Sequence, residues 1–210
     1  LAKTTLNKLS PDVVVTNTIT IPWGAATAHF LGKPHVWFIR EFGVLDHGLK
    51  FFQPFDNILE FVRNSSNLVL TNSSAVTKVL FGDNHKKNVS TVRLHVDIPL
   101  DALYQDKNNY FARRNATKLV IAGTVSESKG QLDALLAVRE LVRRKRTVEL
   151  IVMGYGTPDY LERLKRIVED ENLLPFVRFF DFKENPYPVI SRADIVLVCS
   201  RNEAFGRTTL

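Results

Sequence analysis

The residues best suited to chemistry form a short stretch near the end of the chain, Glu203 to Gly206. The stretch follows an apolar run, residues 194–199, that predicts a buried strand, and it precedes the apparent start of a helix. Backbone N–H groups and the positive end of a helix dipole attract anionic oxygens at such a position. The Glu203 carboxylate can accept hydrogen bonds from sugar hydroxyls. The pattern indicates a site for a ligand with phosphate and hydroxyl groups, with a surface carboxylate or a helix cap as the alternative role of Glu203.

A second charged candidate is Lys129, which lies between a predicted strand (residues 118–122) and a predicted helix (residues 131–144). Its ammonium group could interact with a diphosphate bound over the same edge of the sheet. The P-loop pattern is absent, so the alternative is a lysine that is simply solvated in a loop.

Other motifs in this half narrow the possible chemistry. Gly154-Tyr155-Gly156 begins a dinucleotide fingerprint, but Asp159 stands where the third glycine is required, which disfavours NAD or FAD binding. The two glycines fit a turn or a close backbone approach. Five histidines and a single cysteine show no ligand spacing, so we expect no metal site. We interpret that cysteine, Cys199, as a buried small side chain rather than a reactive thiol.

Short apolar runs alternate with helix-like segments along the whole chain, which predicts an α/β protein with parallel sheets and crossover helices. The predicted strands cover residues 13–17, 34–39, 68–71, 89–96, 118–122, 148–153, 177–180 and 194–199. The predicted helices cover residues 22–31, 51–63, 131–144, 159–169 and 187–192, and a further helix runs from a cap at Ser73 or Ser74 to Phe81. Because ligands of open parallel sheets bind beyond the carboxyl ends of the strands, the candidate residues belong at those ends.

The composition is that of a globular protein with acidic partners. The 210 residues are 45% hydrophobic and 24% charged, and the formal net charge is +6. A positive charge favours nucleotide phosphates, nucleic acid or anionic lipid, and does not choose between them. The basic run at residues 143–146 is interpreted as a solvated helix end, with a membrane or polyanion patch as the alternative. No apolar run approaches the roughly 20 residues of a membrane span, and no signal peptide is visible, so we expect a cytoplasmic location that includes the inner face of a membrane.

The order of these motifs resembles the family-4 glycosyltransferases, which are retaining, nucleotide-sugar-dependent enzymes of the two-domain GT-B fold. The resemblance is carried by Ile121-Ala122-Gly123, by Lys129-Gly130 at a helix start, by Gly154-Tyr155-Gly156 and by Glu203-Ala204-Phe205-Gly206. It implies two Rossmann-like parallel-sheet domains that face each other across a cleft, both incomplete in this chain. Residues 1–104 would be the C-terminal part of the acceptor-side domain, residues 105–116 a linker, and residues 117–210 the truncated donor domain.

The resemblance also implies roles for individual residues. Glu203 and Lys129 would be catalytic. Donor-binding residues would be Gly123, Thr124, Lys129, Gly154, Glu203, Ala204, Phe205 and Gly206. Thr124 stands where the family has an arginine, and the second glutamate of the family motif would fall at position 211, after the last residue. The acceptor-side histidine of the family has no match, so Arg40 and Glu41 are the candidates on that side.

The expected function is transfer of a sugar from a nucleotide-diphospho-sugar to an acceptor with retention of anomeric configuration. The expected acceptor is a carbohydrate, a lipid or another hydroxyl compound, and peripheral membrane contact is among the expected interactions. No metal or other cofactor and no nucleic acid partner is expected, and a fragment of this length is expected to be inactive alone. The alternative is a non-catalytic nucleotide- or polyanion-binding module on the same scaffold.

Overall fold

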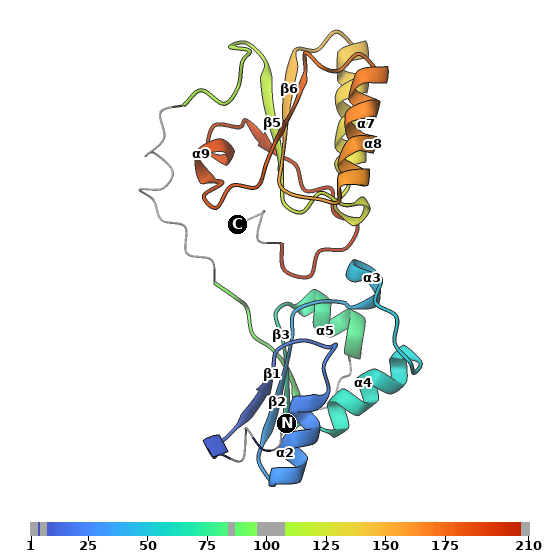
Figure 1. Cartoon of the computed structure of the whole chain (residues 1–210), viewed down its shortest axis with the longest axis vertical. Coiled ribbons are helices and arrows are strands. Elements are labelled where there is room, and N and C mark those ends of the chain that lie inside the picture. The colour runs from blue at the N-terminus through green and yellow to red at the C-terminus, as the bar shows by residue number, and fades with distance from the viewer. Residues whose placement is uncertain (1–3, 5–7, 84–86, 96–107, 207–210) are drawn as a thin grey trace. The chain divides into compact units, whose positions relative to one another are not determined.

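The chain folds into two compact α/β units. The computed structural model describes residues 4, 8–83, 87–95 and 108–206. One unit comprises Leu1–His95 together with Asn202–Phe205, and the other comprises Val96–Arg201 together with Gly206–Leu210. Each unit contains a sheet of four described strands, all of them parallel (Figure 1). The predicted fold class, two parallel α/β sheets, is confirmed.

The first unit alternates strand and helix as the sequence predicts. Its sheet has the order β1 (Val14–Thr16), β2 (His35–Ile39), β3 (Leu68–Thr71), β4 (Val89–Thr91). Its helices are α2 (Trp23–Leu31), α3 (Val44–His47), α4 (Phe55–Asn64) and α5 (Ser74–Phe81). The cap of α5 is Ser73, whose hydroxyl accepts a hydrogen bond from the Val76 N–H at 3.1 Å. Gly32 ends α2 in the left-handed region, at φ 60°.

Two predicted boundaries in this unit are wrong by several residues. Helix α4 begins at Phe55 rather than at residue 51, because Pro54 has an extended backbone and proline disfavours helical geometry in the residue before it. Strand β4 ends at Thr91 rather than at residue 96, because its partner β3 ends at Thr71.

The core of the first unit contains a buried histidine. Helices α2, α4 and α5 pack in one apolar cluster with Trp37, Ile39 and Val69 of the sheet. His35 is only 2% exposed, and its Nε2 lies 2.8 Å from the Thr16 hydroxyl while its Nδ1 lies 3.0 Å from the Ser66 hydroxyl. Burial lowers the pKa of His35, because the low dielectric of the core disfavours the imidazolium form.

This burial predicts a pH-dependent stability. The pKa of His35 is lower in the folded than in the unfolded chain, so the unfolded chain binds more protons once the pH falls below about 6.5. Stability is therefore fully present above that pH. It should fall by up to about 1.4 kcal/mol per unit as the pH is lowered from about 6.5 towards the folded pKa. Urea unfolding of the first unit between pH 7.5 and 5.5 measures the slope. His35→Gln should flatten it and the exposed-site variant His29→Gln should not; equal slopes in all three proteins would contradict this account.

The second unit has the sheet order β7-β6-β5-β8. Its strands are β5 (Thr117–Ala122), β6 (Val148–Met153), β7 (Val177–Phe180) and β8 (Ile195–Val196). Its helices are the short η1 (Glu127–Lys129), α7 (Gln131–Arg143), α8 (Pro158–Asp170) and α9 (Tyr187–Ile190). Figure 1 shows α7 and α8 on one face of this sheet and α9 on the other.

Alternation along β5 and β6 sends successive side chains into two cores. Leu119 and Leu150 pack with α7 and α8, whereas Val120 and Ile151 pack in a separate cluster with Val189 of α9. The second cluster also contains Tyr110 and Phe111, which are buried. Residues 108–116, named here the entry segment, therefore form part of the core of the second unit. Residues 105–107 of the predicted linker lie outside the described residues.

The last strand differs most from its prediction. Residues 194–199 were expected to form a buried strand, but β8 contains only two residues, and Ile195 and Val198 are 48% and 40% exposed. The reason is the position of β8 in the sheet. Within the described part of the chain it pairs with β5 alone, so one of its edges and part of its surface lack a neighbouring strand.

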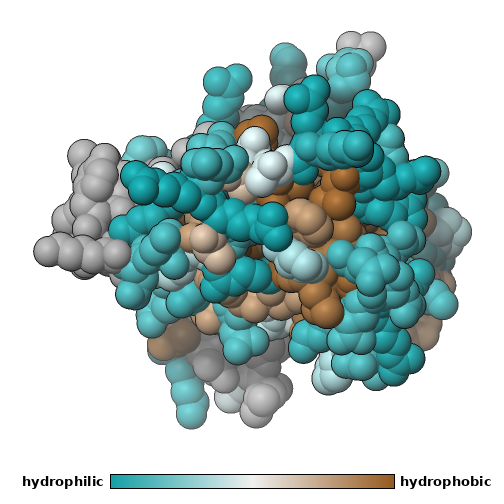
Figure 2. Space-filling view, turned by 90° about the horizontal axis from the view of Figure 1, so that it is seen from above, coloured by the Kyte–Doolittle hydropathy of each residue, from teal (hydrophilic) through white to brown (hydrophobic). Residues whose placement is uncertain are grey.

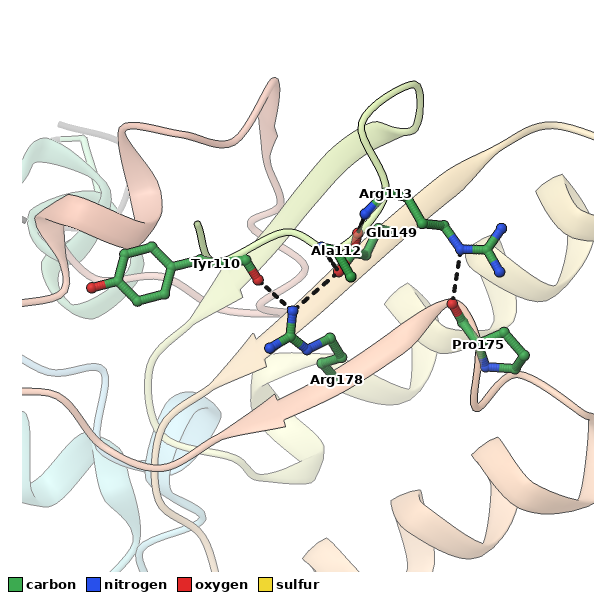
Figure 3. A network of polar contacts seen from close by, with 6 residues as sticks. All are labelled: Tyr110, Ala112, Arg113, Glu149, Pro175 and Arg178. Carbon is green, nitrogen blue, oxygen red and sulfur yellow. Dashed lines mark hydrogen bonds and ion pairs between the residues drawn. The ribbon is translucent and has the colours of Figure 1, made fainter. Parts of the chain in front are cut away.

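A buried carboxylate attaches the entry segment to the sheet (Figure 3). Glu149 of β6 is 1% exposed and accepts hydrogen bonds from the backbone N–H groups of Ala112 at 2.9 Å and Arg113 at 2.8 Å. Arg178 of β7 lies 3.4 Å from the same carboxylate and donates to the Tyr110 carbonyl at 2.5 Å. Glu149 thus satisfies donors from a segment more than thirty residues earlier in the chain.

Figure 2 shows a face of the molecule on which hydrophilic residues predominate and hydrophobic residues gather between them. Within the described ranges, no helix combines the length and the apolar character that crossing a membrane would require.

Candidate functional site

Glycines bring three strand-end loops of the second unit into close contact. A side chain at Gly154, after β6, would place its Cβ 1.8 Å from the carbonyl oxygen of Gly123, after β5. A Cβ at Gly156 would lie 2.4 Å from the Val125 oxygen, and one at Gly130 would lie 2.3 Å from the Cys199 oxygen. The loops that follow β5, β6 and β8 therefore lie side by side, at the edge where ligands of parallel sheets bind.

This contact explains the Gly-x-Gly motif. Gly154 has φ 149°, a conformation that L side chains rarely adopt, and its N–H donates to the Phe180 carbonyl at 3.0 Å. Gly156 forms an isolated parallel bridge with Val125. Both positions therefore need glycine, because the β5 loop lies too close to leave room for a side chain. This agrees with the sequence interpretation that the two glycines allow a close backbone approach.

The loop that carries Lys129 is held by a residue that sequence analysis missed. Gln131, the first residue of α7, is 1% exposed. Its side chain donates to the Thr124 carbonyl at 3.0 Å and accepts from the Ser126 N–H at 3.2 Å. Lys129 itself is half-buried and ends the short helix η1. Gln131 fixes the backbone on both sides of Val125 and so positions the loop. Its only signal in the sequence is an amide side chain directly after Gly130.

A pocket of about 600 Å³ opens beside this loop. Its walls include Thr124, Tyr155, Tyr160 and Arg163. An ion pair between Arg163 and Glu127, with 2.9 Å between nitrogen and oxygen, joins α8 to η1. Burial raises the pKa of Tyr160, and the nearby negative charge of Glu127 raises it further. The Tyr160 hydroxyl therefore stays protonated at neutral pH. Thr124, which is predicted to bind the donor, therefore lines this pocket.

The predicted donor residues Glu203 to Phe205 are grouped with the first unit. Glu203 is exposed, and Ala204 packs against the core of that unit. The Ala204 carbonyl accepts a hydrogen bond from the Ser73 hydroxyl at 2.5 Å. Gly206 is buried and has φ 78°. The helix expected after Gly206 lies outside the described residues, and the joint action of Glu203 with Lys129 of the second unit stays a prediction.

The acceptor-side candidates follow β2 in the first unit. Arg40 is exposed, and its guanidinium carbon lies 6.0 Å from the centre of the Phe38 ring. Glu41 accepts hydrogen bonds from the Ile19 N–H at 2.7 Å and from the Thr18 hydroxyl at 2.8 Å. Glu41 thus positions the loop after β1, and the exposed Arg40 side chain remains the better candidate for acceptor contact.

Comparison with known proteins identifies the family. Residues 105–210, half of the chain, match the family described as glycosyl transferases group 1. The chain belongs to this family. The matched residues include the β5, β6 and β8 loops described above, so the candidate site of this group 1 glycosyl transferase lies in the part that defines its membership. A search of curated proteins finds no match.

Solved structures with the same fold include a protein bound to UDP and proteins described as transferases of sugars. HepE of Anabaena, crystallised with UDP, aligns with a TM-score of 0.76 and 19% identity over 99% of this chain. A glycosyltransferase of Rickettsia africae aligns with a TM-score of 0.73 and 16% identity over 98% of the chain. The pneumococcal O-GlcNAc transferase GtfA, crystallised with UDP and GlcNAc, aligns with a TM-score of 0.71 and 15% identity over 98%. The chain spans 58%, 56% and 41% of these three structures, respectively.

The cysteine of this glycosyl transferase is less buried than predicted. Cys199 is half-buried. Burial raises the pKa of its thiol, and the negative charge of Asp133 raises it further. A raised pKa lowers the thiolate fraction and hence the reactivity. Among the described residues, no three His, Cys, Asp or Glu side chains cluster closely enough to hold a metal ion.

Proposed function

We propose that the protein transfers a sugar from a nucleotide-diphospho-sugar to a hydroxyl acceptor and keeps the anomeric configuration. The observation that carries the proposal is the convergence of the loops after β5, β6 and β8 at one sheet edge, with Lys129 in the first of them, inside the region that matches the glycosyl transferase family. Support also comes from HepE, which has this fold and was crystallised with UDP-glucose.

In the proposed chemistry, one group of residues stabilises the leaving diphosphate and another orients the sugar. Lys129 and the backbone N–H groups of residues 204–206 would stabilise negative charge that grows on the leaving diphosphate. Glu203 would orient the sugar ring through its hydroxyls. Because these groups supply positive potential, we propose that no metal is needed. The acceptor would be a carbohydrate, lipid or other hydroxyl compound, with Arg40 on its side of the site.

Nucleotide binding gives the direct test. The unfolding midpoint of the full-length protein should rise in the presence of UDP or another nucleoside diphosphate, because a ligand at a hundred times its Kd stabilises the folded state by about 2.7 kcal/mol. The rise should persist in EDTA. A rise that EDTA removes would contradict metal independence. If no nucleoside diphosphate raises the midpoint, the donor site is wrong. Binding without any turnover of nucleotide sugars would instead favour the non-catalytic module.

A further inference from the structure

Basic residues gather at the amino edge of the second sheet, which is opposite to the edge that carries the donor loops. The segments that precede β5, β6 and β7 lie side by side there. The Thr117 N–H donates to the Thr147 carbonyl at 3.0 Å. Figure 3 shows the Arg113 side chain, which donates to the Pro175 carbonyl at 3.1 Å. Six cations of the entry segment and of the end of α7 are named here the basic edge: Arg113, Arg114, Arg143, Arg144, Lys145 and Arg146.

Cationic side chains outnumber carboxylates on the basic edge. Arg113 is half-buried, and the other five cations are exposed. Residues 139–147 contain five cations and a single carboxylate, Glu140, which pairs with Arg144 at 2.8 Å. A surface with this excess of positive charge attracts anionic partners.

Two other carboxylates border the basic edge. Glu149 is buried and accepts hydrogen bonds from backbone N–H groups of the entry segment. Glu171 belongs to the acidic residues 169–171 at the end of α8, and it pairs with Arg139 at 2.7 Å. The positive surface is therefore confined to the entry segment and the end of α7.

The end of α7 carries more cations than its capping requires. The Lys145 and Arg146 N–H groups donate to the Val142 and Leu141 carbonyls at 2.8 and 2.9 Å, which satisfies two carbonyls of the last turn. Arg143 already places one cation in that turn, and the effect of the helix dipole fades beyond it. Lys145 has φ 57°, the left-handed conformation in which a helix usually ends on glycine. The run of cations that continues through Arg146 therefore suits a partner outside the chain.

An exposed apolar side chain borders the basic edge. Leu174, before β7, is 63% exposed and adjoins Pro175, to which Arg113 is bonded. Surfaces that lie on a bilayer combine cations, which meet lipid phosphates, with apolar side chains, which enter the boundary of head groups and acyl chains. Surfaces for single-stranded nucleic acid instead present aromatic rings for stacking. The nearby Phe176 ring is half-buried, and the Arg113 guanidinium lies over it, 4.5 Å from its centre. The basic edge therefore suits a bilayer better than a nucleic acid.

We propose that the basic edge binds the surface of an anionic lipid bilayer, with Leu174 in the head-group layer. This is the membrane alternative for the basic run at residues 143–146. Such binding goes beyond the proposed sugar transfer and does not depend on it. The six residues of β6, which runs from one edge of the sheet to the other, span about 20 Å. A bilayer at the amino edge would therefore leave the donor loops at the far edge open to a nucleotide.

Vesicle binding tests this proposal. The full-length protein should sediment with vesicles that contain phosphatidylglycerol and stay in solution with vesicles of phosphatidylcholine alone, and added salt should weaken the binding. Replacing three cations together, by Arg143→Gln, Lys145→Gln and Arg146→Gln, should weaken binding about 100-fold, because each cation near an anionic surface contributes about fivefold. Leu174→Ser should weaken it about tenfold, because an apolar side chain no longer enters the bilayer.

A second triple variant controls for net charge. Lys87→Gln, Lys165→Gln and Arg166→Gln remove the same charge from exposed positions outside the basic edge. This variant should bind the vesicles within about twofold of the unaltered protein, and every variant should keep the unaltered unfolding midpoint.

Three results would overturn the proposal. The first is failure of the unaltered protein to bind phosphatidylglycerol vesicles. The second is an equal loss of binding in the two triple variants, which would show an effect of net charge alone. The third is binding of single-stranded DNA that depends on the basic edge while vesicle binding does not, which would show a nucleic acid site instead.

Discussion

Glu149→Ala is expected to lower the free energy of unfolding of the second unit by about 3 to 5 kcal/mol. The two hydrogen bonds from the Ala112 and Arg113 N–H groups dominate this loss, since a bond to a charged group contributes about 1.5 to 3 kcal/mol. The Arg178 pair adds little, because its nitrogen and oxygen are 3.4 Å apart and the Arg178 side chain is 40% exposed. Urea unfolding measures the total.

Two comparisons make this result specific. Hydrogen exchange at Ala112 and Arg113 should accelerate in Glu149→Ala more than exchange in α8, because the entry segment loses its attachment first. Glu140→Gln removes an exposed carboxylate that pairs with Arg144 on the surface of α7, and it should leave the midpoint unchanged. Equal midpoints for Glu149→Ala and Glu140→Gln would show that the buried network does not hold the entry segment.

Lys129→Ala and Glu203→Ala are expected to reduce sugar transfer by the full-length protein about 10²- to 10³-fold each. The first variant would lack the interaction of Lys129 with charge on the leaving diphosphate, and the second would lack the hydrogen bonds of Glu203 to the sugar hydroxyls. The effect should fall mainly on kcat for Lys129, because the charge it meets grows in the transition state. Transfer rates with a nucleotide-sugar donor measure both variants.

Matched surface variants control for the removal of a charge. Lys165 and Glu169 are exposed on α8, and their alanine variants should transfer sugar at the unaltered rate. Cys199→Ser should also remain nearly fully active, because the thiol has no role in the proposed chemistry. A similar loss of activity in Cys199→Ser and Glu203→Ala would point to damaged folding rather than to a lost catalytic group.

The sheets of this protein are predictable from local sequence. Strands β3, β6 and β7 begin and end where the mainly apolar runs do, because a polar or glycine residue follows each run. The errors occur where a neighbour decides the outcome. Strand β4 ends where β3 does, and β8 is short because it lies at a described edge of the sheet. Such limits depend on strand order, which the amino-acid pattern does not encode locally.

The candidate site was predictable only in part, for the same reason. The positions of Gly123, Gly154 and Lys129 follow from their place after strands. The role of Glu149 depends on the return of the entry segment to β6, although one carboxylate inside the run Val148–Met153 was a visible signal. Residues that act through tertiary contacts appear only once the sheet order is known.

The central claim is best tested by proton NMR of the full-length protein with a panel of nucleotide-diphospho-sugars. The protein should release the nucleoside diphosphate from at least one of them, and the newly formed glycosidic bond should have the anomeric configuration of the donor. Lys129→Ala should slow the release of the nucleoside diphosphate and the formation of the glycosidic bond to the same extent. The account would be contradicted if no nucleotide sugar is consumed and no nucleoside diphosphate stabilises the protein, and its proposed stereochemistry would be contradicted by a product of inverted configuration.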